Sequence, residues 1–378
     1  MNRPKLVFWL GNYSVRRGSP SGIGQRAIQL VKGLNDLCEI QVLCARNEAQ
    51  ADPAIADALT TEADRALAWS EALYCFDNVP PEVLRTYHQD EKAIIAENHT
   101  PVEHCYYHSD CKQSAVVHRD AVEIYRTQVE VADKFVVRSQ AERVAVLDGL
   151  CLIGRLNCDE LRREESLERL VEIIPIGVLR DEIVDVSLGQ ADGPIPIVWN
   201  GGLYGFHNPE FLIHATASLA KRHVVHLHFP FTAERDSPVM RSLEAAVERC
   251  GVGGSVSLGC VSEARGALQS GMAFLVCIGR RSAENELCQR LRTREIFCYR
   301  SPMIVDGHGA TGELVRAKGI GVILESDIRH ARQQVETLIE PRTRRLLVEA
   351  IDRFKPEVLL EEPLAKLGAD LSRLLSER

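Results

Sequence analysis

The sequence contains no long uninterrupted apolar segment, although 45% of its 378 residues are hydrophobic. A membrane-spanning helix needs about 18 to 20 consecutive apolar residues, and no run in this chain approaches that length. The segment that starts at Met1 passes directly into a strand-like run, without the cleavage pattern of a signal peptide. We therefore expect a cytoplasmic protein with no membrane partner.

The chain also lacks an excess of basic residues. It has 45 Lys and Arg against 53 Asp and Glu, which gives a formal net charge of -8. Surfaces that bind nucleic acid are usually strongly basic, so nucleic acid is not expected as a partner. An acidic chain can still hold a local basic pocket for a small anion. The composition does not indicate an oligomeric state.

Cysteine is plentiful, but the pairs that bind metals are missing. None of the twelve cysteines forms a Cys-x-x-Cys pair, and the spacings Cys105 to Cys111 and Cys151 to Cys158 fit no common zinc template. The alternating histidines of His223–His228 are typical of one strand and not of a metal site. We predict that most cysteines are small core residues and that the protein has no metal site.

Short apolar runs alternate with amphipathic segments along most of the chain, which indicates an α/β protein with parallel sheets. In the first half, strands are predicted at Lys5–Leu10, Cys38–Cys44, Ala72–Phe76, Ala93–Ala96, Lys134–Val137 and Val171–Ile174, and a helix at Gly24–Leu34. In the second half, strands are predicted at Ile197–Trp199, Val224–Phe229, Ser255–Leu258, Ala273–Cys277, Met303–Val305 and Gly321–Leu324.

A polar stretch rich in Gly and Pro, Asp181–Pro196, is the best candidate for a domain boundary. We therefore predict two Rossmann-like doubly wound domains, 1–185 and 186–355. Two such domains would face each other across a cleft between their strand ends. A C-terminal helix, 356–378, would follow, and it could cross back to the first domain.

The segment from Gly22 to Ala27 matches the dinucleotide fingerprint Gly-x-Gly-x-x-Ala. A nicotinamide site is not favoured, because a long insert separates these glycines from the first strand and no carboxylate follows the second strand at Cys44. Two interpretations are left open. Gly22 and Gly24 either let a loop turn into a helix or form a flexible loop on the acceptor side of the cleft.

Several motifs at fixed spacing carry a family resemblance. The second half opens with Val198-Trp199-Asn200-Gly201-Gly202-Leu203, and Arg290-Leu291-Arg292 follows later with Glu295, Pro302, Glu313, Gly319 and Gly321. In the first half, Ala132–Asn157 and Val171–Gly177 stand where an acceptor domain would end. Together these segments resemble bacterial family 4 glycosyltransferases of the GT-B fold, whose donor domain opens Trp-Gly-Gly-Gly and later carries Arg-x-Arg. The resemblance extends from about Ala93 to Asp327.

The resemblance implies an acceptor-binding first domain and a donor-binding second domain that share one retaining, metal-independent reaction without a cofactor. Glu295 stands where the family binds the ribose hydroxyls of the donor. The family's other glutamate would fall at Leu287, so its role would pass to Glu284 or to Glu286. The resemblance also makes Arg290 and Arg292 the natural ligands of the donor diphosphate.

Elementary geometry restricts the role of the two arginines. Residues two apart on an α-helix point about 200° away from each other, so Arg290 and Arg292 can meet one diphosphate only from a loop or a first helical turn. The alternative interpretation is a solvent-exposed helix face. Gly201 and Gly202 would let the backbone approach phosphate or sugar closely, or would simply form a tight turn.

Glu97 and His99 follow a predicted strand of the first domain. Either side chain could bind the acceptor or assist proton transfer, and the alternative is an ordinary surface loop.

The sequence thus predicts a hexosyltransferase-like enzyme that uses a nucleoside diphosphate sugar, with GDP as the first expectation and UDP or dTDP next. The absence of membrane-binding stripes favours a soluble small-molecule acceptor, such as a precursor in natural-product biosynthesis. Two alternatives are kept. One is a pseudo-glycosyltransferase that couples a cyclitol-like donor, and the other is an inactive sugar-nucleotide-binding protein, which Leu287 leaves open.

Overall fold

The computed structural model describes residues 3–18, 20–45, 50–97, 111–164, 166–186, 193–232 and 237–378. The chain divides into two compact units. The first takes its described residues from Met1–His104, Ala115–Pro175 and Leu359–Arg378, and the second consists mainly of Ile176–Val358. Each unit has its own sheet and its own hydrophobic core.

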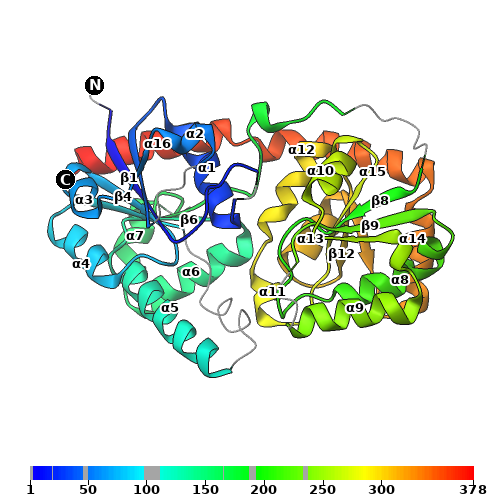
Figure 1. Ribbon diagram of the computed structural model, residues 1–378. Helices are drawn as coiled ribbons and strands as arrows, with labels where there is room; N and C mark the ends of the chain where they lie inside the picture. The colour runs from blue at the N-terminus through cyan, green and yellow to red at the C-terminus, as the bar shows by residue number, and fades with distance from the viewer. Residues whose placement is uncertain are drawn as a thin grey trace. The chain divides into compact units, whose positions relative to one another are not determined.

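The first unit contains a parallel sheet of seven strands in the order β3-β2-β1-β4-β5-β6-β7. Three of these strands, β1, β4 and β6, are labelled in Figure 1. The strands are β1 (Lys5–Gly11), β2 (Glu39–Cys44), β3 (Leu59–Thr60), β4 (Ala72–Cys75), β5 (Ala93–Ala96), β6 (Lys134–Val137) and β7 (Val171–Ile173). The central strands β4 and β5 are buried at every position. Because parallel sheets are covered on both faces, their strands are continuous apolar runs, which explains why the sequence revealed them.

The helices of the first unit are α1 (Gly22–Leu34), α2 (Pro53–Ala56), α3 (Ala63–Trp69), α4 (Pro81–Gln89), α5 (Cys111–Val131), α6 (Gln140–Leu152), α7 (Cys158–Arg163) and α16 (Glu361–Ser376). Some of them begin at recognisable capping residues. Helix α1 begins after Ser21, whose Oγ accepts a hydrogen bond of 3.0 Å from the backbone N–H of Gly24. Helix α6 begins in the same way after Ser139.

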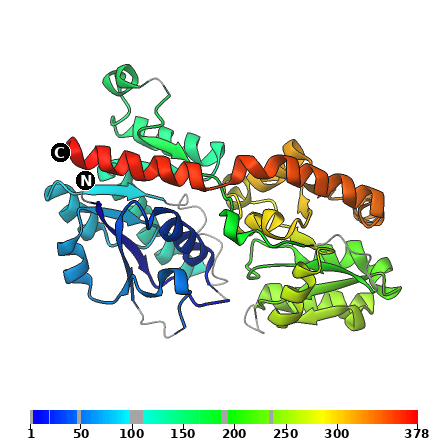
Figure 2. The same ribbon diagram turned by 90° about the horizontal axis from the view of Figure 1, so that it is seen from above.

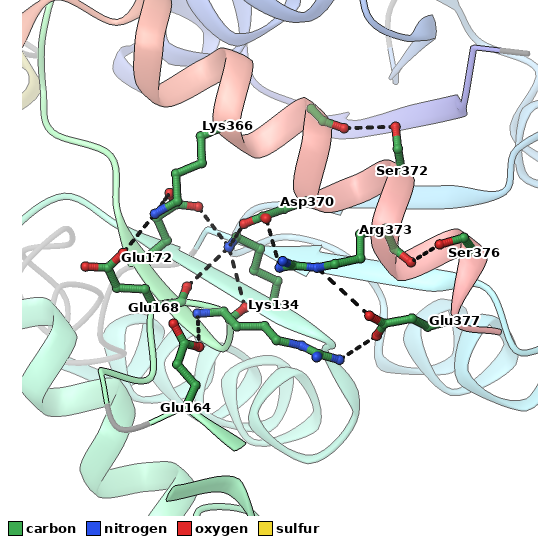
Figure 3. Close-up of polar contacts among 12 residues, drawn as sticks. Lys134, Glu164, Glu168, Glu172, Lys366, Asp370, Ser372, Arg373, Ser376 and Glu377 are labelled. Atoms are coloured by element: carbon green, nitrogen blue, oxygen red, sulfur yellow. Dashed lines mark hydrogen bonds and ion pairs between the residues drawn. The ribbon is translucent and has the colours of Figure 1, made fainter. Parts of the chain in front are cut away.

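The C-terminal helix α16 completes the first unit. It packs closely against α1 at Gly33, where an added Cβ would lie 2.1 Å from Cδ1 of Leu364 and would force that side chain to move. Below it, the ammonium of Lys134 on β6 is fully buried between the carboxylates of Glu172 on β7 and Asp370 on α16 (Figure 3). In Figure 2 the red α16 helix ends beside the strands of this unit.

The second unit contains a parallel sheet of six strands in the order β10-β9-β8-β11-β12-β13. The strands are β8 (Ile195–Val198), β9 (Val225–Phe229), β10 (Val256–Leu258), β11 (Phe274–Cys277), β12 (Met303–Asp306) and β13 (Gly321–Leu324). The helices are α8 (Pro209–Lys221), α9 (Pro238–Cys250), α10 (Val261–Gln269), α11 (Ala283–Leu287), α12 (Arg294–Tyr299), α13 (Gly309–Lys318), α14 (Ile328–Leu338) and α15 (Pro341–Phe354). Helices α8, α9 and α14 enclose the main core on one face of the sheet.

The described residues of the second unit also form the short 3₁₀ helices η2 (Arg180–Glu182), η3 (Gly253–Ser255), η4 (Leu291–Thr293) and η5 (Lys355–Val358). Residues 176–186, which we call the connecting segment, follow the first sheet and contain η2. The backbone N–H of Val178 donates to the carbonyl of Val358 at 3.0 Å, and that of Val184 donates to the carbonyl of Cys298 at 2.9 Å. The connecting segment is therefore part of the second unit.

Every strand that the sequence predicted is present. Strand β3 was not predicted, because its two residues carry no periodic signal. The predicted domain boundary at 185/186 falls at the end of the connecting segment, whereas the compact units divide between Pro175 and Ile176. None of the helices in the described ranges is long and apolar enough to cross a membrane.

Candidate functional site

Strand order marks one place in the second sheet where the chain reverses direction. It moves outward from β8 to β10 on one side and from β11 to β13 on the other, so the turns after β8 and β11 diverge. In open α/β sheets ligands bind at such a switch point, beyond the carboxyl ends of the strands. The residues that follow β8, β11 and β12 therefore define the candidate site.

The turn after β8 is shaped by two glycines and one arginine. Gly201 has φ of +139°, and an added Cβ there would lie 2.7 Å from Cζ of Arg292. The Arg292 guanidinium donates to the carbonyl of Gly202 at 3.3 Å and lies 5.7 Å from the ring centre of Trp199. The glycines thus allow the close approach of Arg292, and their predicted approach to phosphate or sugar stays a prediction.

Arg290 lies beside the next part of the same loop. Its guanidinium stacks on Phe206, with Cζ 4.5 Å from the ring centre, and its Nη2 donates to Oδ1 of Asn285. Its backbone N–H donates to Oγ1 of Thr311 at 3.2 Å. Arg290 is the N-cap of η4 and Arg292 lies within η4, so both precede α12. The arginines are therefore in a loop and a single short turn, which is the arrangement that geometry requires for a shared anion.

Asn285 joins three segments that are distant in sequence. Its Nδ2 donates to the carbonyl of Arg280 at 2.6 Å and to that of Phe206 at 3.3 Å, while its Oδ1 accepts from Arg290. Gly309 has φ of +64°, and a Cβ there would lie only 1.7 Å from the backbone oxygen of Asn285. Asn285 thus fixes the loops around Arg290, a role that the sequence did not indicate.

A small hollow lies next to Arg290. It is lined by Cys277, Asn285, Arg290, Val305, Asp306, His308, Thr311 and Gly312. Asp306, at the end of β12, accepts from the backbone N–H of Gly279 at 2.6 Å and of His308 at 3.0 Å. Burial raises the pKa of this carboxyl group. Asp306 thus ties the loops after β11 and β12 together.

Glu295 lies in the first turn of α12, and only 16% of its side chain is exposed. Its Oε1 is 3.6 Å from Nη1 of Arg294, and its buried Oε2 has no hydrogen-bond partner among the described residues. Burial raises the pKa of Glu295, against the attraction of Arg294 and Arg292. A buried carboxylate oxygen without a donor is a place where a ligand hydroxyl gains a strong hydrogen bond.

Unpartnered donors also gather near the two arginines. His207 accepts from the backbone N–H of Tyr204 at Nδ1, 3.1 Å away, so its proton is on Nε2. Burial lowers the pKa of His207 well below its usual value, and Arg292 and Arg290 add to that effect. Nε2 of His207, Nε1 of Trp199 and Nη1 of Arg292 are buried without a hydrogen-bond partner within the described ranges. Neutral and cationic donors of this kind suit an anionic ligand.

The replacements predicted for the family's first glutamate lie on the short helix α11. Glu286 is exposed and Leu287 is partly buried. Glu284 belongs to α11, but its side chain lies outside the part of the chain that the structure describes. The choice between Glu284 and Glu286 stays a prediction.

In the first unit, Glu97 forms a buried network at the end of β5. Its carboxylate accepts from Nε of Arg26 at 2.9 Å and from the hydroxyl of Tyr74. Arg26 also donates to the carbonyls of Ile174 and Pro175, at 3.0 and 3.1 Å. Burial raises the pKa of Tyr74 well above its usual value. Both oxygens of Glu97 thus have partners within the first unit, and these contacts explain its burial without any ligand. Its predicted role toward an acceptor stays a prediction.

The other predicted residues of the first unit are less informative. His99 lies outside the described residues. Gly22 and Gly24 lie in the first turn of α1 and not in the loop before it. A Cβ at Gly24 would be 1.8 Å from the backbone oxygen of Ser14, so Gly24 is required for close packing. The interpretation that these glycines let the chain turn into a helix fits this geometry, and the flexible loop does not.

Metal chemistry has no obvious centre in the described parts of the chain. No three His, Cys, Asp or Glu side chains there gather as a group that could hold a metal ion. The ten cysteines whose side chains the structure describes are free thiols. A reaction that needs no metal stays a prediction.

Comparison with known proteins identifies the fold. Protein-family models give no match, and a search of the curated proteins gives none. Sucrose-phosphate synthase from Thermosynechococcus elongatus has a TM-score of 0.65 at 14% identity, over 100% of both chains. Anabaena HepE, in complex with UDP and glucose, has a TM-score of 0.64 at 12% identity, over 100% of both chains.

A third similar structure is α,α-trehalose 6-phosphate synthase from Burkholderia multivorans. Its TM-score is 0.61 at 11% identity, over 100% of this chain and 98% of that chain. All three are GT-B glycosyltransferases, so the predicted α/β fold of the GT-B type is confirmed. The predicted family 4 subgroup stays a prediction.

Proposed function

We propose that this protein is a glycosyltransferase that takes its sugar from a nucleoside diphosphate donor bound at the carboxyl ends of the second sheet. The observation that carries the proposal is the convergence of Arg290 and Arg292 on the loop after β8, with the unpartnered oxygen of Glu295 close behind them in the chain. Arginine forks bind phosphate oxygens, and a carboxylate binds ribose hydroxyls. The GT-B fold, and a neighbour solved with UDP and glucose, support this assignment.

In the proposed reaction the arginines stabilise the diphosphate as it leaves. The acceptor hydroxyl attacks from the face that the diphosphate vacates, and a phosphate oxygen removes its proton, so the sugar keeps its anomeric configuration. The protein then contributes position and charge rather than a nucleophile. Metal independence, a soluble acceptor and the order GDP, then UDP or dTDP, are parts of this proposal that come from the sequence.

A second candidate is a sugar-nucleotide-binding protein without transfer activity. Leu287 favours it, because a leucine cannot accept the sugar hydroxyl bond that the family's glutamate makes. The pseudo-glycosyltransferase remains an alternative for the same site. All three bind a nucleotide in the second unit and differ only in what they do with it.

Calorimetry with GDP, UDP and dTDP, and then with their sugars, tests the common part of the proposal. We expect one base to bind clearly more tightly than the others and the diphosphate to bind more tightly than the monophosphate. Release of diphosphate with a panel of soluble acceptors then separates the enzyme from the inactive protein. Failure of every nucleoside diphosphate to bind would overturn the proposal.

Replacing Glu295 by Gln should weaken the nucleoside diphosphate and its sugar alike, by about 1 to 3 kcal/mol for a lost charged hydrogen bond. Because burial raises the pKa of Glu295, its carboxylate takes up a proton at a higher pH than an ordinary glutamate. Affinity in the parent protein should therefore fall as the pH drops through that raised value. The Gln variant should show no such fall.

The matched control is Glu336→Gln, which neutralises an exposed glutamate on α14. Affinity and its pH profile are measured by calorimetry, and folding by thermal unfolding. Unchanged affinity in Glu295→Gln would remove Glu295 from the site.

A further inference from the structure

Glu182 of the connecting segment and Glu295 of α12 both contact Arg294. Nη2 of Arg294 is 2.9 Å from Oε1 of Glu182, and only 14% and 10% of the two side chains are exposed. The other oxygen of Glu182 accepts from the backbone N–H of Leu179 at 3.0 Å. Glu182 is thus held in place by its own segment and presents one oxygen to Arg294.

The guanidinium of Arg294 lies near two carboxylates and is closer to one of them than to the other. Its contact with Glu182 is a hydrogen bond of 2.9 Å, whereas its nearest approach to Glu295 is 3.6 Å, which is an ion pair without a hydrogen bond. The second oxygen of Glu295 is left without a partner within the described ranges. If Glu182 did not hold Arg294, the planar fork could form two parallel bonds to Glu295, the favoured geometry of an isolated arginine and carboxylate.

We propose that Glu182 is a positioning residue for the nucleotide site: by holding Arg294, it keeps the carboxylate of Glu295 available to ligand hydroxyls. This inference rests on the proposed function, in which Glu295 binds the ribose. It adds a residue from outside the sheet and its loops to the site. The position of Arg294 affects both the packing of the connecting segment and the availability of Glu295 to the ligand. Packing of the segment and binding of the nucleotide are therefore linked.

A purely structural ion pair is the competing explanation. In that case Glu182 and Arg294 would only fasten the connecting segment to α12, as the backbone bond from Val184 to Cys298 already does. Removing the pair would lower stability, but it would not change how the ligand affinity depends on pH. The charge around Glu295 provides the distinguishing measurement.

The charged and titratable groups around Glu295 are Arg292 on η4, Arg265 on α10, Glu182 in the connecting segment, and Arg294, Cys298 and Tyr299 on α12. Glu182 raises the pKa of Glu295 and Arg294 lowers it. In Glu182→Gln the raising charge is gone, and the neutral amide holds Arg294 less strongly than a carboxylate does, so Arg294 can approach Glu295. Both changes favour the ionised form, so the pH below which the ligand is lost should move downward.

The first test is Glu182→Gln in the full-length protein, with the nucleoside diphosphate that binds the parent most tightly. At neutral pH we expect an affinity about tenfold weaker, because Arg294 now occupies the oxygens that the ligand needs. The acid limb of binding, which is the fall in affinity as the pH drops, should shift to lower pH at the same time. Calorimetry across the pH range measures both quantities.

The second test is the double variant Glu182→Gln with Arg294→Gln. Removing the arginine frees Glu295 again, so affinity should recover relative to Glu182→Gln alone, while the acid limb moves upward. A structural pair predicts no recovery. Arg294→Lys, alone and combined with Glu182→Gln, provides a further comparison if either protein folds poorly. An ammonium lacks the planar fork for two parallel bonds to Glu295, so the loss of Glu182 should cost less affinity in the lysine background than in the parent.

The outcomes separate this inference from the proposed function. If the parent protein binds no nucleoside diphosphate, both are wrong. If the parent binds and Glu295→Gln weakens binding, but Glu182→Gln changes neither affinity nor the acid limb, the proposed function stands and the positioning role of Glu182 is overturned.

Discussion

Replacing Arg292 by alanine should lower the rate of sugar transfer by about 10² to 10³, the usual cost of removing one fixed donor from a developing negative charge. Arg292 is placed for this role by close packing. Its guanidinium lies beside Gly201, donates to Gly202 and covers Trp199, while Nη1 has no partner in the described part of the chain. A donor held this way needs little reorganisation when the diphosphate departs.

Arg292→Lys keeps the charge but loses the fork, so its loss of rate should be smaller than that of alanine and still measurable. Affinity for the monophosphate, which lacks the β-phosphate, should change less than affinity for the diphosphate in both variants. Arg345→Ala, which removes an exposed arginine on α15, is the matched control. Thermal unfolding checks that Arg292→Ala has not simply opened the turn.

A parent rate in Arg292→Ala would assign the diphosphate to other groups. Arg290→Ala then becomes decisive, since Arg290 reaches the same loop through Phe206. Parent rates in both variants would leave the Gly201-Gly202 turn as the remaining candidate and would return the arginines to a structural role.

The strands were predictable because a parallel sheet buries both faces and makes each strand a short continuous apolar run. The two arginines and the glycine turn stand at fixed spacing within short motifs, which made them candidates, and their role toward a diphosphate stays a prediction. Asn285 was not. Its bond to Phe206 spans 79 residues, so its role depends on how two loops pack and not on any local pattern.

Glu97 is a predicted site residue whose internal partners the sequence did not indicate. A carboxylate at the end of a strand is a reasonable candidate for acceptor chemistry, and the sequence gives no sign of its partner. Arg26, 71 residues earlier, binds it in the folded unit. Local sequence therefore predicts where polar groups emerge from a sheet, whereas only the packed structure shows which of them are already satisfied.

Lys134 shows both what the local sequence predicts and what only the packed structure reveals. Its segment was predicted as a strand, and β6 is that strand, but nothing local indicates that the lysine side chain is fully buried. Its partners are Glu172 on β7 and Asp370 on α16, 236 residues away. Nζ also donates to the backbone oxygens of Glu168 and Arg169, at 3.2 and 3.4 Å (Figure 3). The cluster joins the C-terminal helix to the first sheet by buried polar contacts.

Replacing Lys134 by Met should therefore destabilise the first unit by about 3 to 5 kcal/mol. Methionine fills most of the space, but it leaves the carboxylates of Glu172 and Asp370 facing each other in a buried site. Lys366, which lies 2.9 Å from Glu172 but is about half exposed, screens them only partly. Urea unfolding in a Trp199→Phe background measures the change, because the remaining Trp9 and Trp69 both belong to the first unit.

Two further variants show whether the free energy lost in Lys134→Met comes from the buried charges. Arg65→Met removes an exposed pair with Glu62 in the first unit and should cost about 0 to 1 kcal/mol. The triple variant Lys134→Met, Glu172→Leu, Asp370→Leu removes all three charges, and it should recover most of the stability lost in Lys134→Met, since apolar replacement of a buried ion cluster is often neutral. A loss below about 1 kcal/mol in Lys134→Met would mean that α16 is held by Leu364, Leu367 and Leu371 alone.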